Sequence, residues 1–221
     1  MKALIVSVLI LVLVLSPKVF AQDPTRCNPD TLDKLVALTF DDGPHVRYTE
    51  RILQILEKYN VKASFFIIGE NAVQHPETIK KIYDQGHELG NHTYTHVSIN
   101  KVSKEKLTEE LEKTSHVIEE ITSFRPRVFR PPFGAYSDAS IATVTSLGYR
   151  SVLWSKDSKD WQLPSVDEIL QSMEVSSGDI LLFHDYNQAN SPTPDALEKL
   201  IPRLLEKGYK FVTVTELLYC K

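Results

Sequence analysis

Residues 35–44 read LVALTFDDGP, an apolar run that ends in two carboxylates, a glycine and a proline. The run has the composition of a buried strand, and the glycine and proline force the chain to turn directly after it. Because neighbouring strand residues point to opposite sides, Asp41 and Asp42 are not expected to do one job together. One of them could ligate a metal while the other waits beside it as a base, although the same four residues are equally typical of a plain loop.

Short apolar runs and helical patterns alternate along the rest of the chain. The expected strands are 35–40, 63–68, 128–129, 150–154, 180–183 and 210–214, and the expected helices are 51–59, 77–85, 103–121, 137–147 and 194–205. This alternation is typical of βα units that build a mostly parallel sheet. The sequence therefore predicts an α/β fold with about seven such units and a single domain.

The first residues have the pattern of an export signal. Lys2 is followed by an apolar stretch from Ala3 to Leu15 and by the small-residue site Val19-Phe20-Ala21. We expect a signal peptide over residues 1–21, cleaved after Ala21, which makes the protein secreted or cell-envelope associated and leaves no stable membrane insertion. An uncleaved membrane anchor is the alternative, although a spanning helix needs about 20 apolar residues.

The composition narrows the choice of partners. The net charge is -4, and there is no block rich in lysine and arginine, which excludes nucleic acid as an expected partner. The chain has two cysteines, Cys27 and Cys220. In an oxidising compartment we expect them to form a disulfide that ties the two ends of the domain together, with two separate thiols as the alternative. We also expect a monomer.

A second motif, NHTYTH at residues 91–96, places two imidazoles four residues apart. On a helical turn, that spacing would put His92 and His96 on one face, within reach of one cation. Thr93 stands where zinc proteases carry a glutamate base, so the base must come from elsewhere, and Asp41 is available. Such a pair also arises often by chance.

Together, one of the two Asp residues, His92 and His96 would give a metal three ligands and leave at least one position open for water. That count is typical of a catalytic site, because structural zinc sites are normally closed by four ligands. We expect one divalent ion, zinc first, with cobalt and nickel compatible with the same ligands.

Three further polar groups follow predicted strands: RPPFG at 130–134, DSKDW at 157–161, and His184-Asp185 after ILLF. Each alone could be a rigid turn or a polar loop. In α/β barrels, however, catalytic residues lie at the carboxyl ends of the strands. Their shared position therefore favours one active site.

These motifs closely resemble, in order and spacing, the five motifs of the polysaccharide deacetylase family, also called carbohydrate esterase family four or the nodulation-deacetylase homology domain. The matching segments are 39–44, 92–96, 130–134, 157–161 and 182–184. The resemblance implies a distorted (β/α) barrel with about seven parallel strands. It makes residues 22–34 a lead segment and residues 35–221 the catalytic domain.

The resemblance also implies roles for individual residues. Asp42, His92 and His96 would bind the metal, Asp41 would be the base that activates a metal-held water, and His184 would be the acid. Arg130 would hold the base and Asp160 would orient the acid. Trp161 and Leu182 would line the pocket for the acetyl methyl group, and the backbone amide of Phe133 would contact the oxyanion. Many members of the family have tyrosine in place of Phe133, a change expected to affect only sugar contacts.

The expected activity is metal-dependent hydrolysis of N-acetyl groups on an N-acetylglucosamine-type polysaccharide, such as peptidoglycan or a chitin-like polymer, with release of acetate. Three other activities stay open from the sequence: hydrolysis of an O-acetyl ester or a cyclic imide, silent glycan binding, and glycoside hydrolysis by the paired carboxylates. The last would need two carboxyls about 5 to 10 Å apart around the bond.

Overall fold

The computed structural model describes residues 34–162, 164–185 and 191–220. Strands and helices alternate through these residues, as predicted, and every strand pairing in them is parallel. The strands are β1 (Lys34–Asp41), β2 (Ser64–Ile67), β3 (Glu88–Asn91), β4 (Val128–Phe129), β5 (Arg150–Ser151), β6 (Lys156–Asp157), β7 (Asp179–His184) and β8 (Tyr209–Val212).

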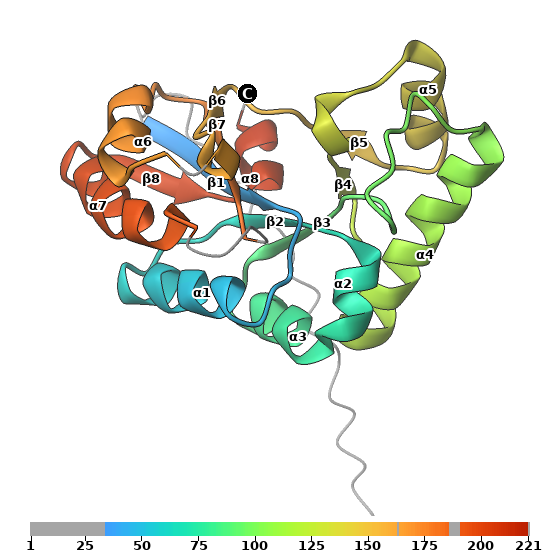
Figure 1. Cartoon of the computed structure of the whole chain (residues 1–221), viewed down its shortest axis with the longest axis horizontal. Helices are drawn as coiled ribbons and strands as arrows, with labels where there is room; N and C mark the ends of the chain where they lie inside the picture. Colours follow the sequence, from blue (N-terminus) through green and yellow to red (C-terminus); the bar gives the residue numbers. More distant parts are fainter. Residues whose placement is uncertain (1–33, 163, 186–190, 221) are drawn as a thin grey trace, which may run out of the picture.

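The strands form one curled sheet in the order β5-β4-β3-β2-β1-β7-β6, and β8 pairs with the first half of β1. Figure 1 shows the sheet with helices packed around its outside. The helices are α1 (Tyr48–Lys58), α2 (Gly69–Gln74), α3 (Pro76–Asp84), α4 (Lys104–Thr122), α5 (Asp138–Ser146), α6 (Val166–Ser172), α7 (Thr193–Glu206) and α8 (Val214–Tyr219), with short 3₁₀ turns η2 (Pro132–Gly134) and η3 (Asp160–Gln162). This is the distorted (β/α) barrel that the resemblance implied.

The alternation of side chains along β1 decides which carboxylate faces inward. Val36, Leu38 and Phe40 belong to the large cluster between the sheet and the helices, whereas Ala37 belongs to a second cluster inside the curl. Because strand residues alternate between faces, Asp41 lies on the same inner side as Ala37. Phe40 stacks on the Phe65 ring with a centroid distance of 5.0 Å, which fixes β1 against β2.

The structure adds elements that the apolar pattern did not indicate, namely β3, β6, α2, α6 and α8. Strand β3 reads ELGN and contains no β-branched residue. Its Gly90 is required by packing, because a Cβ there would lie 2.6 Å from the ring of Phe66. The last strand was expected to reach residue 214 but ends at Val212, because Thr213 caps α8 in a capping box with Glu216.

The expected signal peptide, its cleavage site, Cys27 and all of the lead segment except Lys34, which begins β1, lie outside the described residues, so these expectations and the disulfide to Cys220 stay predictions. None of the helices described is both long enough and apolar enough to cross a membrane.

Candidate active site

The predicted functional residues meet at one edge of the sheet because parallel strands end there together. In the parallel ladder Asp41, the last residue of β1, is the partner of His184, the last residue of β7. On the other side, Asn91 at the end of β3 pairs with Ile67 of β2 and with Phe129 of β4. The segments that follow β1, β3, β4 and β7 therefore surround one site.

The three expected metal ligands form a cluster. Asp42 Oδ1 lies 3.3 Å from His92 Nε2 and 3.2 Å from His96 Nε2. Ligand atoms of the three residues all lie within 4.8 Å of one another. Asp42 Oδ1 is buried, and no described residue gives it a hydrogen bond of good geometry. A carboxylate oxygen and two imidazole nitrogens converging on one point fit a divalent ion such as zinc.

The expectation that the histidine pair lies on a helical turn is wrong. Residues 92–96 follow β3 as a loop without helical structure. Two of its residues, Thr93 and His96, have φ angles of 67° and 57°, in the left-handed region. These reversals, not helical periodicity, bring the two rings to a centroid distance of 5.1 Å.

Arg130 connects the expected base to the expected ligands. Its Nη1 donates to Asp41 Oδ1 at 2.7 Å and to Thr39 Oγ1 at 2.8 Å. Its guanidinium, which is fully buried, lies 4.1 Å from the centre of the Phe66 ring. Its backbone oxygen is 2.8 Å from His92 Nδ1, so Nδ1–H can donate there and leave Nε2 free to ligate. Asp41 Oδ2 lies 3.9 Å from the same Nε2.

His184 and Asp160 form a second buried pair. The Nδ1 atom of His184 is 2.7 Å from Asp160 Oδ1, and its backbone N–H donates to Oδ2 at 2.8 Å. Burial opposes the charged imidazole, but the hydrogen bond and charge of Asp160, helped by Asp41 and Asp42, raise the pKa of His184 to about 9. The imidazolium form is therefore favoured at neutral pH. Thr193, the first residue of α7, also donates to Asp160 Oδ2.

The residues expected to contact substrate are placed differently from one another. Phe133 is 69% exposed, and its ring meets His96 edge-on with a centroid distance of 4.5 Å. Its φ of 62° turns the backbone, and its amide donates to no described residue. Trp161 is half exposed on η3, whereas Leu182 is buried in β7.

Residues to which the sequence analysis assigned no role complete the turn after β1. Asp185 is fully buried, and its carboxylate accepts a hydrogen bond from Thr49 Oγ1 at 2.6 Å. Its backbone N–H donates to the backbone oxygen of Asp41 at 3.2 Å. A Cβ on Gly43 would lie 2.2 Å from the carboxylate oxygens of Asp185, so only glycine fits at this position. The signal available in the sequence was the acidic residue directly after His184.

Burial and neighbouring charges shift the pKa values of Asp42 and Asp185 in opposite directions. Burial opposes ionisation of Asp42, but contacts with His92 and His96 and the charge of His92 outweigh it and hold its pKa well below the usual range. Burial raises the pKa of Asp185 to about 7, against the hydrogen bond from Thr49, and the charge of Asp42 adds to the rise. The site therefore concentrates negative charge on Asp42, where a cation would bind.

Known proteins resemble the chain over almost all of the described length. Residues 28–152 match the family model of polysaccharide deacetylases. A peptidoglycan-N-acetylglucosamine deacetylase of Bacillus cereus is 40% identical over 86% of this chain and 90% of its own length.

Two solved structures are also similar to this chain in both fold and sequence. A peptidoglycan N-acetylglucosamine deacetylase crystallised with a benzamide compound is 35% identical, with a TM-score of 0.81 over 84% of this chain and 88% of that one. A family 4 acetyl xylan esterase from Clostridium thermocellum in complex with a cobalt ion is also 35% identical, with a TM-score of 0.79 over 84% and 90%. The chain therefore belongs to the polysaccharide deacetylase family, a family of hydrolases.

Proposed function

We propose that this protein removes N-acetyl groups from N-acetylglucosamine-type residues of peptidoglycan and releases acetate. The observation that carries the proposal is the convergence of Asp42, His92 and His96 beside the Arg130–Asp41 and Asp160–His184 pairs. The choice of peptidoglycan over another glycan is supported by the names of the Bacillus cereus relative and of the first solved structure. Acting on a wall polymer also agrees with the expected export.

A divalent cation held by Asp42, His92 and His96, with zinc as our first choice, would supply a Lewis acid that polarises the acetamide carbonyl and acidifies water. Asp41 takes the proton of the attacking water, with its Oδ1 held by Arg130 and its other oxygen directed toward His92. His184 then protonates the departing sugar nitrogen, because an unprotonated amine is a poor leaving group. The Phe133 amide, which donates to no residue in the described part of the chain, would donate to the oxyanion.

Two other activities are less well supported by the geometry. Glycoside hydrolysis would need Asp41 and Asp42 as a free pair, but Arg130 holds the first and the two imidazoles surround the second. A silent glycan-binding protein would be expected to lack a ligand, the base or the acid, and all are present. Hydrolysis of O-acetyl esters is the second candidate, favoured by the likeness to the acetyl xylan esterase.

Acetate release from defined glycans tests the proposal. We expect release from peptidoglycan fragments, less from chitin oligomers, and loss of activity with a chelator that added zinc or cobalt reverses. Acetate from acetylxylan alone would make the protein an esterase, and activity that survives complete metal removal would contradict the metal centre.

The pH profile should report the Asp160–His184 pair. Because the acid must be protonated, we expect kcat/KM to fall as the pH rises toward about 9, the pKa of His184. A cation near Asp42 would repel the imidazolium of His184 and shift this fall in kcat/KM, the basic limb of the profile, to lower pH. Asp160→Asn removes the charge that raises the pKa, so the basic limb should move further down. An unmoved limb in this variant would contradict the assignment of His184 as the acid.

The same pair links stability to pH. The folded pKa of His184 lies above its ordinary value of about 6.5, so its contribution to stability is full below about 6.5 and is lost as the pH rises through about 9.

A further inference from the structure

The loop that carries His92 and His96 adopts a backbone that its own residues disfavour. Thr93 and His96 both have positive φ, which side chains with a Cβ rarely adopt. Such a conformation persists only where the surroundings fix it. The loop must therefore be held by contacts from elsewhere in the chain.

Three of these contacts are made by one carboxylate. Glu110 Oε2 accepts the backbone N–H groups of Tyr94 at 2.8 Å and of Thr95 at 2.7 Å. Its other oxygen, Oε1, accepts the Thr95 hydroxyl at 3.0 Å. The remaining N–H, that of Thr93, is taken by Asn91 Oδ1 at 2.9 Å. Three residues lie between the histidines, and a residue of β3, Asn91, accepts only from the N–H of Thr93. Glu110 accepts from the N–H groups of the other two, Tyr94 and Thr95.

The opposite side of the loop is fixed by α2. The backbone N–H of Gly69 donates to the backbone oxygen of Thr93, and that of Glu70 donates to the backbone oxygen of Tyr94, each at 3.0 Å. A Cβ on Gly69 would lie 2.3 Å from the Tyr94 ring, so α2 and the loop are in close contact. The loop is therefore clamped between the first turn of α2 and Glu110 of α4.

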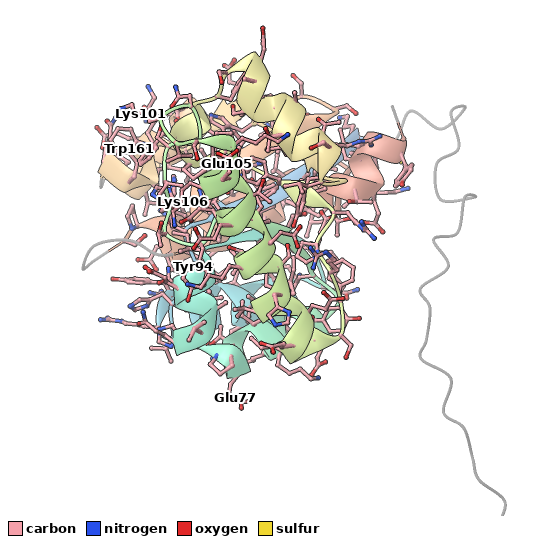
Figure 2. The ribbon with its side chains drawn as sticks, turned by 90° about the vertical axis from the view of Figure 1, so that its right-hand side faces the viewer. Glu77, Tyr94, Lys101, Glu105, Lys106 and Trp161 are labelled. Atoms are coloured by element: carbon pink, nitrogen blue, oxygen red, sulfur yellow. The ribbon has the colours of Figure 1, made fainter. Side chains whose placement is uncertain are left out.

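Glu110 is an unusual residue for its place in α4. It is only 1% exposed, on the helix face that also buries Leu107 and Leu111. A buried carboxylate is costly unless it is paired and hydrogen-bonded, and Lys106 Nζ pairs with it at 3.1 Å. Figure 2 shows Tyr94 beside α4, on the side of the helix that carries Lys106. Nothing in the packing of α4 requires a charge here, whereas the loop requires an acceptor.

The two expected histidine ligands differ in how they are held. His92 has a hydrogen bond from its ring to the Arg130 oxygen. The His96 ring has no such hydrogen bond to a backbone oxygen in the described part of the chain. Its neighbours are side chains of the site: Asp42 Oδ1 lies 3.2 Å from its Nε2, and the rings of His92 and Phe133 have centroid distances of 5.1 and 4.5 Å from it. The position of His96 Nε2 therefore depends on the backbone that precedes it.

We propose that Glu110 is a positioning residue for the metal centre, which places His96 by holding the Tyr94 and Thr95 amides. The inference rests on the proposed function, because it assumes that His96 is a ligand. Glu110 touches neither ion nor substrate and acts only through the loop.

Zinc affinity, measured by competition with a chromophoric chelator, tests the proposal without any substrate. Glu110→Ala should bind zinc on the order of 10- to 100-fold more weakly, the usual cost of losing a partner that orients a ligand. Glu110→Gln should keep affinity within a few-fold, because its amide oxygen can accept both N–H groups. Glu109→Ala is the matched control: Glu109 is exposed on the same helix and also pairs with Lys106, but it does not contact the loop.

The outcomes separate this inference from the proposed function. If Glu110→Ala binds zinc as tightly as the parent, or if Glu110→Gln loses as much affinity as Glu110→Ala, the proposal is wrong. Asp42→Ala is measured in parallel, and unchanged affinity in that variant would instead remove the metal centre itself. Should Glu110→Ala fail to fold, amide hydrogen exchange of the parent decides: slow exchange at Tyr94 and Thr95 supports the clamp, and exchange at the free-peptide rate overturns it.

Discussion

Asp41→Asn is expected to lower kcat by a factor of about 10² to 10⁴ while zinc affinity stays close to that of the parent protein. Asparagine keeps the size of the side chain and can still accept from Arg130, but it cannot take a proton from water. Asp41 is not among the three converging ligands, and its nearer oxygen is 3.9 Å from His92 Nε2. Steady-state acetate release and zinc titration of the same preparation measure both quantities.

The variant also leaves the fully buried Arg130 without its counter-charge. Breaking such a pair costs up to about 3 to 5 kcal/mol, so the free energy of unfolding must be measured alongside activity. The double variant Asp41→Asn/Arg130→Leu removes both charges and should recover part of that stability, because the 130 side chain packs on the Phe66 ring. It should recover no activity. Activity that returns with stability would show that the single variant failed through unfolding and not through loss of a base.

The second large effect concerns the metal ligands. Asp42→Ala and His92→Ala should each weaken zinc binding by more than the roughly 100-fold that loss of an outer partner can cost, and should abolish activity at ordinary zinc concentrations. Each removes one of the three proposed ligands that converge in the described part of the chain. Zinc at 100 times its Kd should stabilise the parent protein by about 2.7 kcal/mol, and neither variant should show this gain.

His116→Ala is the matched control for this experiment. His116 lies exposed on α4 and pairs with Glu120 on the same helix. Its replacement should leave both zinc-dependent stabilisation and acetate release unchanged. A parent protein whose unfolding does not respond to zinc, cobalt or nickel would contradict the metal centre.

The sequence pattern predicted a parallel α/β sheet with the candidate site residues at one edge for a physical reason, whereas the barrel was implied by the family resemblance. Four of the six predicted strands, 35–40, 128–129, 150–154 and 180–183, end at or shortly before a polar motif, and parallel strands bring such ends to one edge. LVALTF and ILLF are apolar on both faces, which is the pattern of strands covered on both sides. The structure therefore brings together Asp41, Asp42 and His184, as the sequence analysis expected.

The parts that sequence reasoning missed depend on contacts that leave no periodic pattern. Strand β3 is formed because Gly90 allows close approach of Phe66, not because its residues favour strands. The histidine loop depends on Glu110, which lies in a helical pattern where a glutamate is ordinarily expected to face solvent. Asp185 and Thr49, 136 residues apart in sequence, meet only in the folded chain.

The in-register pairing of Asp41 with His184 separates chemistry from selectivity in this protein. Main-chain hydrogen bonds between two buried neighbouring strands set the spacing of the two proposed proton-transfer groups, Asp41 and His184, so that spacing does not depend on the segments that project beyond the sheet. Those segments can change in length or composition without moving either group. The same pair of strands could thus serve polymers of different shape if only the segments beyond the sheet were exchanged.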